Sequence, residues 1–198
     1  MAIELINITK SYGDKVIFSN LNLAFEREKM TAIMGPSGAG KTTLVNMLLG
    51  LQAPDGGEIR GLGSDARVSA VFQEDRLLEH KSGLSNILFV LKNPKQYAER
   101  AAELMHAVGL GEDMHKRARA YSGGMKRRLA LCRALIVDDF DLMVLDEPFK
   151  GLDASFKLQV MEMVKSEIAG KTVILITHDE AEAAFFDSKI LDISNYTA

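Results

Sequence analysis

The sequence predicts an α/β fold built on a mainly parallel sheet. Two continuous apolar runs, at 142–145 and 172–176, are typical of strands buried on both faces of such a sheet. Helix-like periodicity at 154–168 separates these two runs. A third apolar run, at 30–34, leads through a glycine-rich segment into a helix-like run at 43–49. Ligands of open α/β sheets bind at the carboxyl ends of the strands, so we expect the functional site there.

The glycine-rich segment 35–43 fits the pattern G-x-x-x-x-G-K-[ST] without a mismatch. Glycines allow a tight turn whose N–H groups converge on one anion, and the positive end of the following helix adds to the attraction. The lysine brings a full charge to the outer phosphates, and the following threonine hydroxyl can ligate Mg²⁺. The candidate phosphate-binding residues are Gly35, Pro36, Ser37, Gly38, Ala39, Gly40, Lys41, Thr42 and Thr43.

Composition limits the function classes. The chain has 198 residues and a net charge of −3, which gives no reason to expect nucleic acid as a partner. No run approaches the roughly 20 apolar residues of a membrane span, so another subunit would have to supply any spans. Cys132 is the only cysteine, which excludes an internal disulfide, and we interpret it as a small buried residue on a helix.

The elements around the phosphate loop divide the chain. Strands are expected at 2–8, 16–18, 21–25, 58–60 and 67–72, with a turn at 11–15. Residues 76–120 read instead as helical, because Leu77, Leu84 and Leu88 recur at helical spacing and Pro94 opens a second helix that ends at Gly109. We expect one domain, 1–198, with a core and β subdomain over about 1–75 and 121–198 and a helical subdomain over about 76–120.

An acidic pair follows the strand at 142–145. Asp146 and Glu147 should face the phosphate loop if both lie at the carboxyl edge of the sheet. Asp146 can then hold Mg²⁺, and Glu147 can polarise a water for attack on the γ-phosphate. The alternative is a surface acidic pair at a strand end.

A second anion site is suggested before the helix at 125–137. Ser122 can cap this helix, and Gly123 and Gly124 leave N–H groups uncovered at its start. Taken alone, the segment also fits an ordinary helix cap with a flexible entry.

In chain order these motifs resemble the nucleotide-binding domain of ABC (ATP-binding cassette) transporters, over essentially the whole chain. The phosphate loop resembles Walker A, 142–147 resembles Walker B with its glutamate, and 122–124 resembles the Ser-Gly-Gly of the family signature. The fold implied is a P-loop NTPase core with an N-terminal antiparallel β subdomain and a helical insertion.

The resemblance also implies roles for isolated polar and aromatic residues. It makes Glu147, Gln73 and His178 catalytic, with Gln73 also contacting Mg²⁺ beside Thr42 and Asp146. Tyr12 resembles the aromatic residue that stacks on adenine, and Val16 is counted with it in the nucleotide site. Asp153 resembles the D-loop aspartate, which communicates across a dimer. Ser122, Gly123 and Gly124 would cover the ATP bound by a second subunit.

The function implied is that of the ATPase subunit of a membrane transporter, with ATP and Mg²⁺ as ligands. Its partners would be a transmembrane permease, a second ATP-binding subunit of the same kind and an extracytoplasmic substrate-binding protein, at the cytoplasmic face of the membrane. The motif Asp-Glu-Pro-Phe-x-x-Leu-Asp at 146–153 resembles that of the nitrate, sulfonate and taurine importers. The departures are Tyr121 for the usual leucine, Met125 for the usual glutamine, and Lys150 where small residues are common. An exporter ATPase, a soluble ABC ATPase and a non-ABC P-loop kinase are the alternatives.

Overall fold

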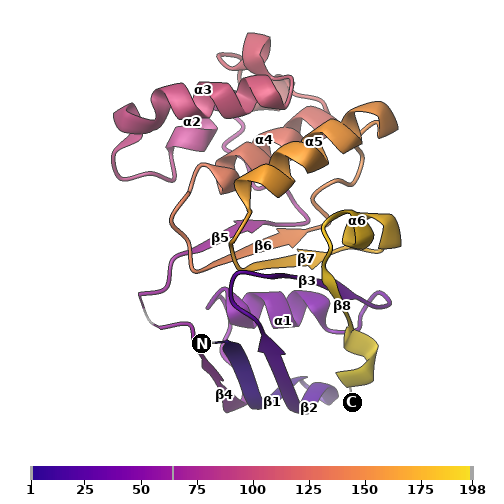
Figure 1. Ribbon diagram of the computed structural model, residues 1–198. Coiled ribbons are helices and arrows are strands. Elements are labelled where there is room, and N and C mark those ends of the chain that lie inside the picture. Colours follow the sequence, from indigo (N-terminus) through magenta and orange to yellow (C-terminus); the bar gives the residue numbers. More distant parts are fainter. Residues whose placement is uncertain (1, 64, 197–198) are drawn as a thin grey trace. The chain divides into compact units, whose positions relative to one another are not determined.

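The computed structural model describes residues 2–63 and 65–196 (Figure 1). Its strands are β1 (Ile3–Tyr12), β2 (Lys15–Phe25), β3 (Met30–Met34), β4 (Gly56–Arg60), β5 (Val68–Val71), β6 (Leu142–Asp146), β7 (Val173–Ile176) and β8 (Lys189–Asp192). Its helices are α1 (Lys41–Leu48), α2 (Gly83–Leu88), α3 (Ala98–Ala107), α4 (Gly123–Leu135), α5 (Ala154–Glu167) and α6 (Glu180–Phe185). Short 3₁₀ turns η1 (Pro94–Tyr97), η2 (Gly111–Asp113), η3 (Ala118–Ala120) and η4 (Ile193–Tyr196) connect or follow them.

The strands form two sheets, as the sequence predicts. One is antiparallel, in the order β2-β1-β4, and the other has five strands in the order β5-β6-β7-β3-β8. Within the second sheet β3 pairs in parallel with both β7 and β8. The predicted α/β fold with an N-terminal antiparallel subdomain is confirmed.

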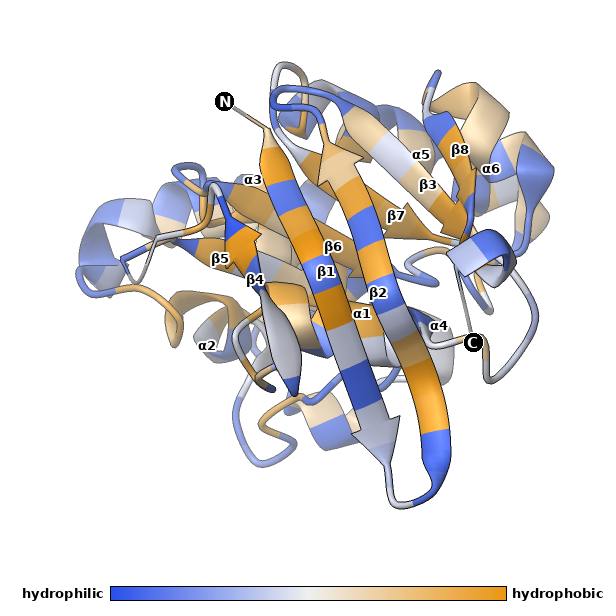
Figure 2. Cartoon of the chain, turned by 90° about the horizontal axis from the view of Figure 1, so that it is seen from below, coloured by the Kyte–Doolittle hydropathy of each residue, from blue (hydrophilic) through white to orange (hydrophobic). Residues whose placement is uncertain are grey.

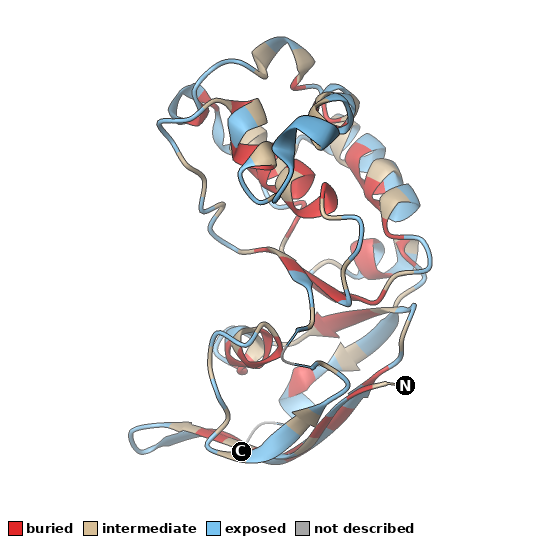
Figure 3. Ribbon diagram, turned by 90° about the vertical axis from the view of Figure 1, so that its left-hand side faces the viewer, coloured by how far each residue is buried: buried red, intermediate tan, exposed pale blue. Residues whose placement is uncertain are grey.

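The chain divides into two compact units. The first comprises Met1–Val68, Asp141–Val144 and Gly170–Ala198, and the second comprises Ser69–Phe140 and Leu145–Ala169. The antiparallel sheet, α1, β3, β7 and β8 belong to the first unit. The helices α2, α3, α4 and α5 belong to the second unit, and each of them has both buried and exposed residues (Figure 3).

In the antiparallel sheet, β1 and β2 alternate between apolar and polar residues, as Figure 2 shows. The sequence predicts two strands, at 16–18 and 21–25, but the structure has a single strand, β2, over both ranges. The predicted interruption between them was wrong. Asn20 adopts a left-handed conformation with φ of 61°, and the register shifts between the pairs Ile8↔Leu21 and Lys10↔Phe18. An extra residue therefore enters β2 as a bulge and interrupts the alternation without ending the strand.

The hairpin turn is also tighter than predicted. The sequence places a turn over 11–15, whereas Tyr12 pairs directly with Lys15 and only Gly13 and Asp14 connect the strands. Gly13 has φ of 57°, a conformation that glycine adopts without a steric penalty. The hairpin consequently projects Tyr12 and Val16 from its end, where both are nearly half exposed.

The parallel strands of the first unit have matching registers. Ile33 of β3 is level with Ile176 of β7 and with Leu191 of β8. All four residues of β7 are buried, as its continuous apolar run predicts. The carboxyl ends of β3 and β7 therefore meet at one edge of the sheet, where the segments after Met34 and after Ile176 begin.

In the helical segment, the predicted helix around Leu77 and Leu78 begins later, at Gly83. The Asn86 side chain explains the difference: its Oδ1 accepts from Leu78 N at 2.7 Å, and its Nδ2 donates to Leu78 O at 3.1 Å. The backbone there is satisfied by a side chain instead of a helical ladder. Pro94 opens η1 and α3 follows, in agreement with the prediction.

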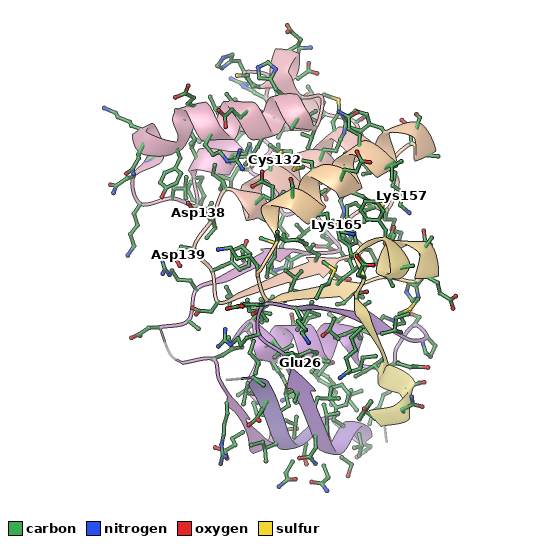
Figure 4. All side chains as sticks on the ribbon, viewed as in Figure 1. Glu26, Cys132, Asp138, Asp139, Lys157 and Lys165 are labelled. Atoms are coloured by element: carbon green, nitrogen blue, oxygen red, sulfur yellow. The ribbon has the colours of Figure 1, made fainter. Side chains whose placement is uncertain are left out.

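Helix α4 carries Cys132 on its buried side. Figure 4 labels this residue, whose thiol contacts Leu104 O of α3 at 3.5 Å. Burial raises the pKa of the Cys132 thiol to about 12, so the thiolate is not formed near neutral pH. The interpretation of Cys132 as a small buried residue is confirmed.

Tyr121, which precedes the cap of α4, is buried against α2. Its hydroxyl donates to Asp113 O at 2.7 Å, and burial raises its pKa to about 12. A Cβ at Gly83 would lie 2.3 Å from this hydroxyl oxygen and 2.8 Å from Met105 Cε. Gly83 is therefore required by the tyrosine that stands opposite it.

Among residues 2–63 and 65–196, no helix combines the length and the apolar character that a membrane crossing requires.

Replacing Gly83 with alanine should destabilise the protein. The added Cβ must displace a tyrosine ring fixed by its hydrogen bond, so we expect the free energy of unfolding to fall by about 1–3 kcal/mol. Urea denaturation measures the change. Gly63→Ala is the control, because a Cβ there meets no atom within 4 Å and its φ is not left-handed. Equal midpoints for the two variants would contradict the packing argument.

Candidate functional site

The phosphate loop in the first unit is shaped by three left-handed glycines. Gly35, Gly38 and Gly40 have φ of 141°, 81° and 80°. The loop begins directly after β3, and Gly40 forms the cap of α1 in the αL conformation. A turn closes between Ala39 N and Pro36 O at 3.3 Å. This is the strand–loop–helix context that the motif requires.

Packing fixes two of these glycines as firmly as their dihedral angles do. A Cβ at Gly35 would lie 2.8 Å from Ile193 Cγ2. A Cβ at Gly40 would lie 2.7 Å from Phe18 Cζ and 2.8 Å from Ile17 Cγ2. Strand β2 and η4 thus support the back of the loop, while Ser37 and Gly38 remain exposed at its tip. Backbone dihedral angles and packing therefore act together to define the shape of the loop.

Lys41 carries the charge of this loop. Its Nζ donates to Gly35 O at 2.6 Å and to Pro36 O at 2.9 Å, which places the ammonium over the turn. At the end of β8, two hydrogen bonds from Ser194 lower the pKa of Asp192, and the charge of Lys41 contributes to the same shift. Thr42 is exposed in the first turn of α1, and Thr43 is buried behind it.

The hairpin of β1 and β2 places Tyr12 and Val16 in the same unit as the loop. Tyr12 Oη donates to Gln52 Oε1 at 2.6 Å, and Lys10 Nζ lies 5.8 Å from the Tyr12 ring centroid. Val16 belongs to the strand whose next two residues pack on Gly40. An exposed aromatic ring and an exposed aliphatic side chain can cover the face of a planar ring system.

His178 also belongs to the first unit. It lies two residues after β7, whose end is level with the end of β3, and its side chain is exposed. Thr177 is buried beside it and donates through Oγ1 to Glu182 Oε2, and Asp179 caps α6 by accepting from Ala181 N at 2.9 Å. These hydrogen bonds tie the residues on both sides of His178 to α6, and His178 lies at the strand edge from which the phosphate loop also starts.

In the second unit, Glu147 follows β6 in a strained conformation. Its φ is 47°, in the left-handed region that side chains other than glycine seldom adopt. Its carboxylate Oε2 accepts from Lys150 Nζ at 2.5 Å, and Lys150 N donates to Glu147 O at 3.2 Å. Such outliers persist only where surrounding contacts over-determine them.

Those contacts come chiefly from Arg127 of α4. Its side chain is 5% exposed and donates to the carbonyl oxygens of Phe72, Asp146 and Glu147. Gln73 O lies 3.5 Å from Nη1, and Asp75 Oδ1 accepts from the same atom at 3.1 Å. One guanidinium thus joins the end of β5, which precedes Gln73, to the end of β6, which precedes Glu147. The Gln73 side chain itself is exposed.

The signature segment lies in this unit too. Ser122 caps α4, accepting from Met125 N at 3.3 Å, which confirms its predicted capping role. Gly124 lies against Gly151 O, 3.4 Å from a Cβ built on the glycine. A cavity of about 470 Å³ lies beside it, and Asp153, which is exposed, contributes to its lining. The other lining residues are Ser122, Gly124, Arg128, Gly151, Leu152, Ser155 and Phe156.

The structure therefore brings the predicted residues together in two sets. The phosphate loop, Tyr12, Val16 and His178 lie in the first unit, and Gln73, Asp146, Glu147, Asp153 and 122–124 lie in the second. Their catalytic and binding roles stay predictions. Sequence reasoning missed Arg127, although a signal was present: a cation shares one helical face with Ala130, Leu131 and Ala134.

A parallel strand that leads through a glycine-shaped loop into a helix beginning with Lys-Thr defines the class of P-loop nucleotide-binding proteins. The sequence model of the family described as ABC transporter matches residues 18–150, more than half of the chain. The chain belongs to the ABC transporter family, as an ATP-binding cassette.

Relatives include importer and exporter subunits. The chain is 35% identical to an aliphatic sulfonates import ATP-binding protein of Rhodococcus jostii, covering 98% of this chain and 72% of the relative. It is 34% identical to a sulfate/thiosulfate import ATP-binding protein of Vibrio cholerae, and the match covers 98% of this chain and 56% of the relative. It is 37% identical to a Nod factor export ATP-binding protein of Cupriavidus metallidurans, and the match covers 91% of this chain and 64% of the relative.

Solved cassettes share the fold. MJ0796, a bacterial ABC transporter cassette solved as a dimer, superposes with a TM-score of 0.83 and 28% identity, covering 97% of this chain and 95% of that one. A post-hydrolysis state of the same cassette, bound to ADP and Pi, gives the same TM-score at 27% identity. The predicted family and the ATPase activity are confirmed.

Replacing Lys41 with alanine should weaken nucleotide binding. The variant removes the only full charge that the loop itself carries, so we expect about 10- to 100-fold weaker binding of ATP. Isothermal calorimetry measures it. Lys29→Ala in the same unit removes an exposed lysine, with a side chain 67% exposed, and should bind ATP as the unmodified protein does. Unchanged affinity in Lys41→Ala would mean that ATP binds elsewhere.

Proposed function

We propose that this chain is the ATP-hydrolysing subunit of a multi-subunit membrane importer, in which two cassettes enclose ATP and drive the permease. One observation carries the proposal. Nearly the whole chain, 98% of it, aligns with ATP-binding proteins whose names record import of sulfonates and of sulfate or thiosulfate.

The first unit would bind the nucleotide. Backbone N–H groups of the loop 35–40 and the amino end of α1 suit the β- and γ-phosphates, with Lys41 neutralising their charge. Tyr12 and Val16 would contact the adenine, and His178 would contact the γ-phosphate. The support for these roles is their position: all of these residues belong to one compact unit, and three left-handed glycines shape the loop.

The second unit would supply the hydrolytic groups. Glu147 would accept a proton from the attacking water. A carboxylate suits this role when the backbone that carries it is held in place, as that of Glu147 is by Arg127. Mg²⁺, when bound, would neutralise phosphate charge, and Thr42, Gln73 and Asp146 offer the hard oxygen ligands it prefers. No group of three His, Cys, Asp or Glu side chains gathers as a metal site within the described residues. A cation held largely by phosphates and water needs no such cluster.

A second copy of the chain would complete the ATP site. Ser122, Gly123 and Gly124 lie at the amino end of α4, and Ser122 and Gly124 line the cavity that Asp153 also lines. Such helix ends attract anions. In a head-to-tail dimer this surface would face the γ-phosphate bound by the partner. The signature segment would then bind a phosphate that its own subunit does not hold. The dimeric cassette with the same fold supports this arrangement.

The transported substrate would be a sulfonate or a related small oxyanion. Several of the most similar relatives are named for sulfonate import, and residues 146–149 read Asp-Glu-Pro-Phe. The remaining partners would be a permease and an extracytoplasmic substrate-binding protein, with this chain at the cytoplasmic face of the membrane. Export is the second candidate direction, favoured by the relative named for Nod factor export at 37% identity.

Replacing Glu147 with glutamine should leave Mg-ATP binding intact and abolish most turnover. The amide cannot accept the proton, so kcat should fall by about 10²- to 10⁴-fold and the variant should accumulate as an ATP-bound dimer. Phosphate release and size-exclusion chromatography with ATP measure both effects. Glu162→Gln, an exposed glutamate of the same unit, is the control. Full turnover in Glu147→Gln would remove Glu147 from the catalytic role.

The transporter assignment is tested by isolating the tagged chain from mild-detergent extracts of its own cell membranes. We expect a polytopic membrane protein in stoichiometric amount, identified by mass spectrometry, with its neighbours pointing to the substrate. Recovery of ribosomal, DNA-repair or other soluble partners alone would overturn the transporter assignment while leaving the ATPase chemistry in place.

A further inference from the structure

Arg127 is the most extensively bonded side chain of the second unit, and nothing in the roles assigned so far uses it. It lies in the middle of α4, and its side chain is 5% exposed. Its guanidinium hydrogen-bonds to two segments distant in sequence, 72–75 and 146–147. A buried arginine with such a set of acceptors is costly to desolvate and demands an explanation.

The contacts divide evenly between the two segments. Toward the end of β5, Nη1 donates to Phe72 O at 2.5 Å and lies 3.5 Å from Gln73 O, with Asp75 Oδ1 at 3.1 Å. Toward the end of β6, Nε donates to Glu147 O at 3.2 Å, and Nη2 donates to the carbonyls of Asp146 and Glu147. The planar fork of five N–H groups matches this geometry, which a lysine ammonium cannot reproduce.

The strained conformation of Glu147 explains what the hydrogen bonds of Arg127 do. Its left-handed φ of 47° costs free energy, and the chain would relax toward an extended conformation without external support. Relaxation of φ would swing the carboxylate away from its present direction. Arg127 binds the carbonyl oxygens of Asp146 and Glu147, which belong to the peptide units on either side of the Glu147 Cα, so it opposes that relaxation.

We propose that Arg127 is a positioning residue, which holds the backbone of Glu147 and of Gln73 in the relative arrangement that hydrolysis requires. This inference rests on the proposed function, since it takes Glu147 as the group that accepts the proton from water. Arg127 itself touches main-chain atoms and the Asp75 carboxylate, and it does not contact the reacting groups. Its effect therefore falls on kcat, whereas the phosphate loop that binds ATP belongs to the other unit.

The test is Arg127→Lys, which keeps the charge and loses the fork. We expect kcat for ATP to fall by about 10- to 100-fold, because a displacement of the order of 1 Å at a catalytic group has effects of this size. The KM for ATP should change by less than about threefold, since uniform binding is retained. Calorimetric ATP affinity, measured separately, should be unchanged.

Arg133→Lys is a matched control on the same helix. Arg133 also binds carbonyls, donating to Asp75 O and Arg76 O at 2.7 Å each, and Arg76 is likewise left-handed, with φ of 47°. These two hydrogen bonds hold the segment after β5 and leave Glu147 to Arg127. If the role of Arg127 is only structural, both variants should lose thermal stability and kcat together. We expect comparable stability losses and a large fall in kcat for Arg127→Lys alone.

Asp75→Asn is the second variant, in case Arg127→Lys does not fold. It removes the counter-charge of Arg127 and alters no backbone contact, and the Asp75 side chain is 24% exposed, so the fold should tolerate it. We expect kcat to fall by about two- to tenfold at constant KM. Unchanged kcat in Asp75→Asn and in a folded Arg127→Lys, or in Asp75→Asn alone if the other does not fold, would overturn the inference.

Glu147→Gln separates this inference from the proposed function. If Glu147→Gln retains full turnover, the catalytic assignment fails, and the positioning role fails with it. If Glu147→Gln loses turnover while Arg127→Lys matches the unmodified protein, the assignment stands and the positioning role alone is wrong. In the Glu147→Gln background, Arg127→Lys should reduce the residual rate by less than about twofold, because the group it positions has already been removed.

Discussion

A buried guanidinium with five N–H groups is the constraint around which the second unit is organised. Placing Arg127 inside the protein is favourable only if acceptors surround it, and the acceptors available are the carbonyls where β5 and β6 end. Those carbonyls have in turn left the strand ladders and need donors. Arg127 satisfies both requirements at once. It therefore fixes the geometry of the segments that carry Gln73 and Glu147, although it is distant from both in sequence.

The first unit solves the opposite problem, because its phosphate loop must present N–H groups and not carbonyls. Left-handed glycines turn the peptide planes in the required direction, and Phe18, Ile17 and Ile193 fill the space behind them. Lys41 covers the two carbonyls at the start of the loop. Each unit thus brings one polarity of backbone group to its site, donors in the first and restrained carbonyls in the second, and neither depends on regular secondary structure at that point.

Sequence patterns predicted the parts of the fold where side chains decide the structure. The apolar runs of β6 and β7 and the phosphate motif are contiguous, so their environment can be read locally. Prediction failed where the backbone departs from the pattern of its own segment: a left-handed Asn20 inserts a bulge into β2, and the Asn86 side chain takes both backbone groups of Leu78 out of the helix. The partners of Arg127 could not be predicted, since they are main-chain carbonyls of distant segments, which the pattern of its own helix does not identify. The dihedral strain at Glu147 is likewise invisible before the structure is known.

The buried Tyr121 couples the signature to a distant helix. Its ring occupies the space that Gly83 leaves free, and its hydroxyl serves Asp113 O. The residue at the first position of the signature, Tyr121, therefore depends on the residue that packs against it, Gly83. In evolutionary terms, positions 83 and 121 should vary together among relatives, with larger residues at 83 wherever leucine stands at 121. For protein engineering, a signature transplanted from another cassette would bring a cavity and an orphaned carbonyl unless its packing partners came with it.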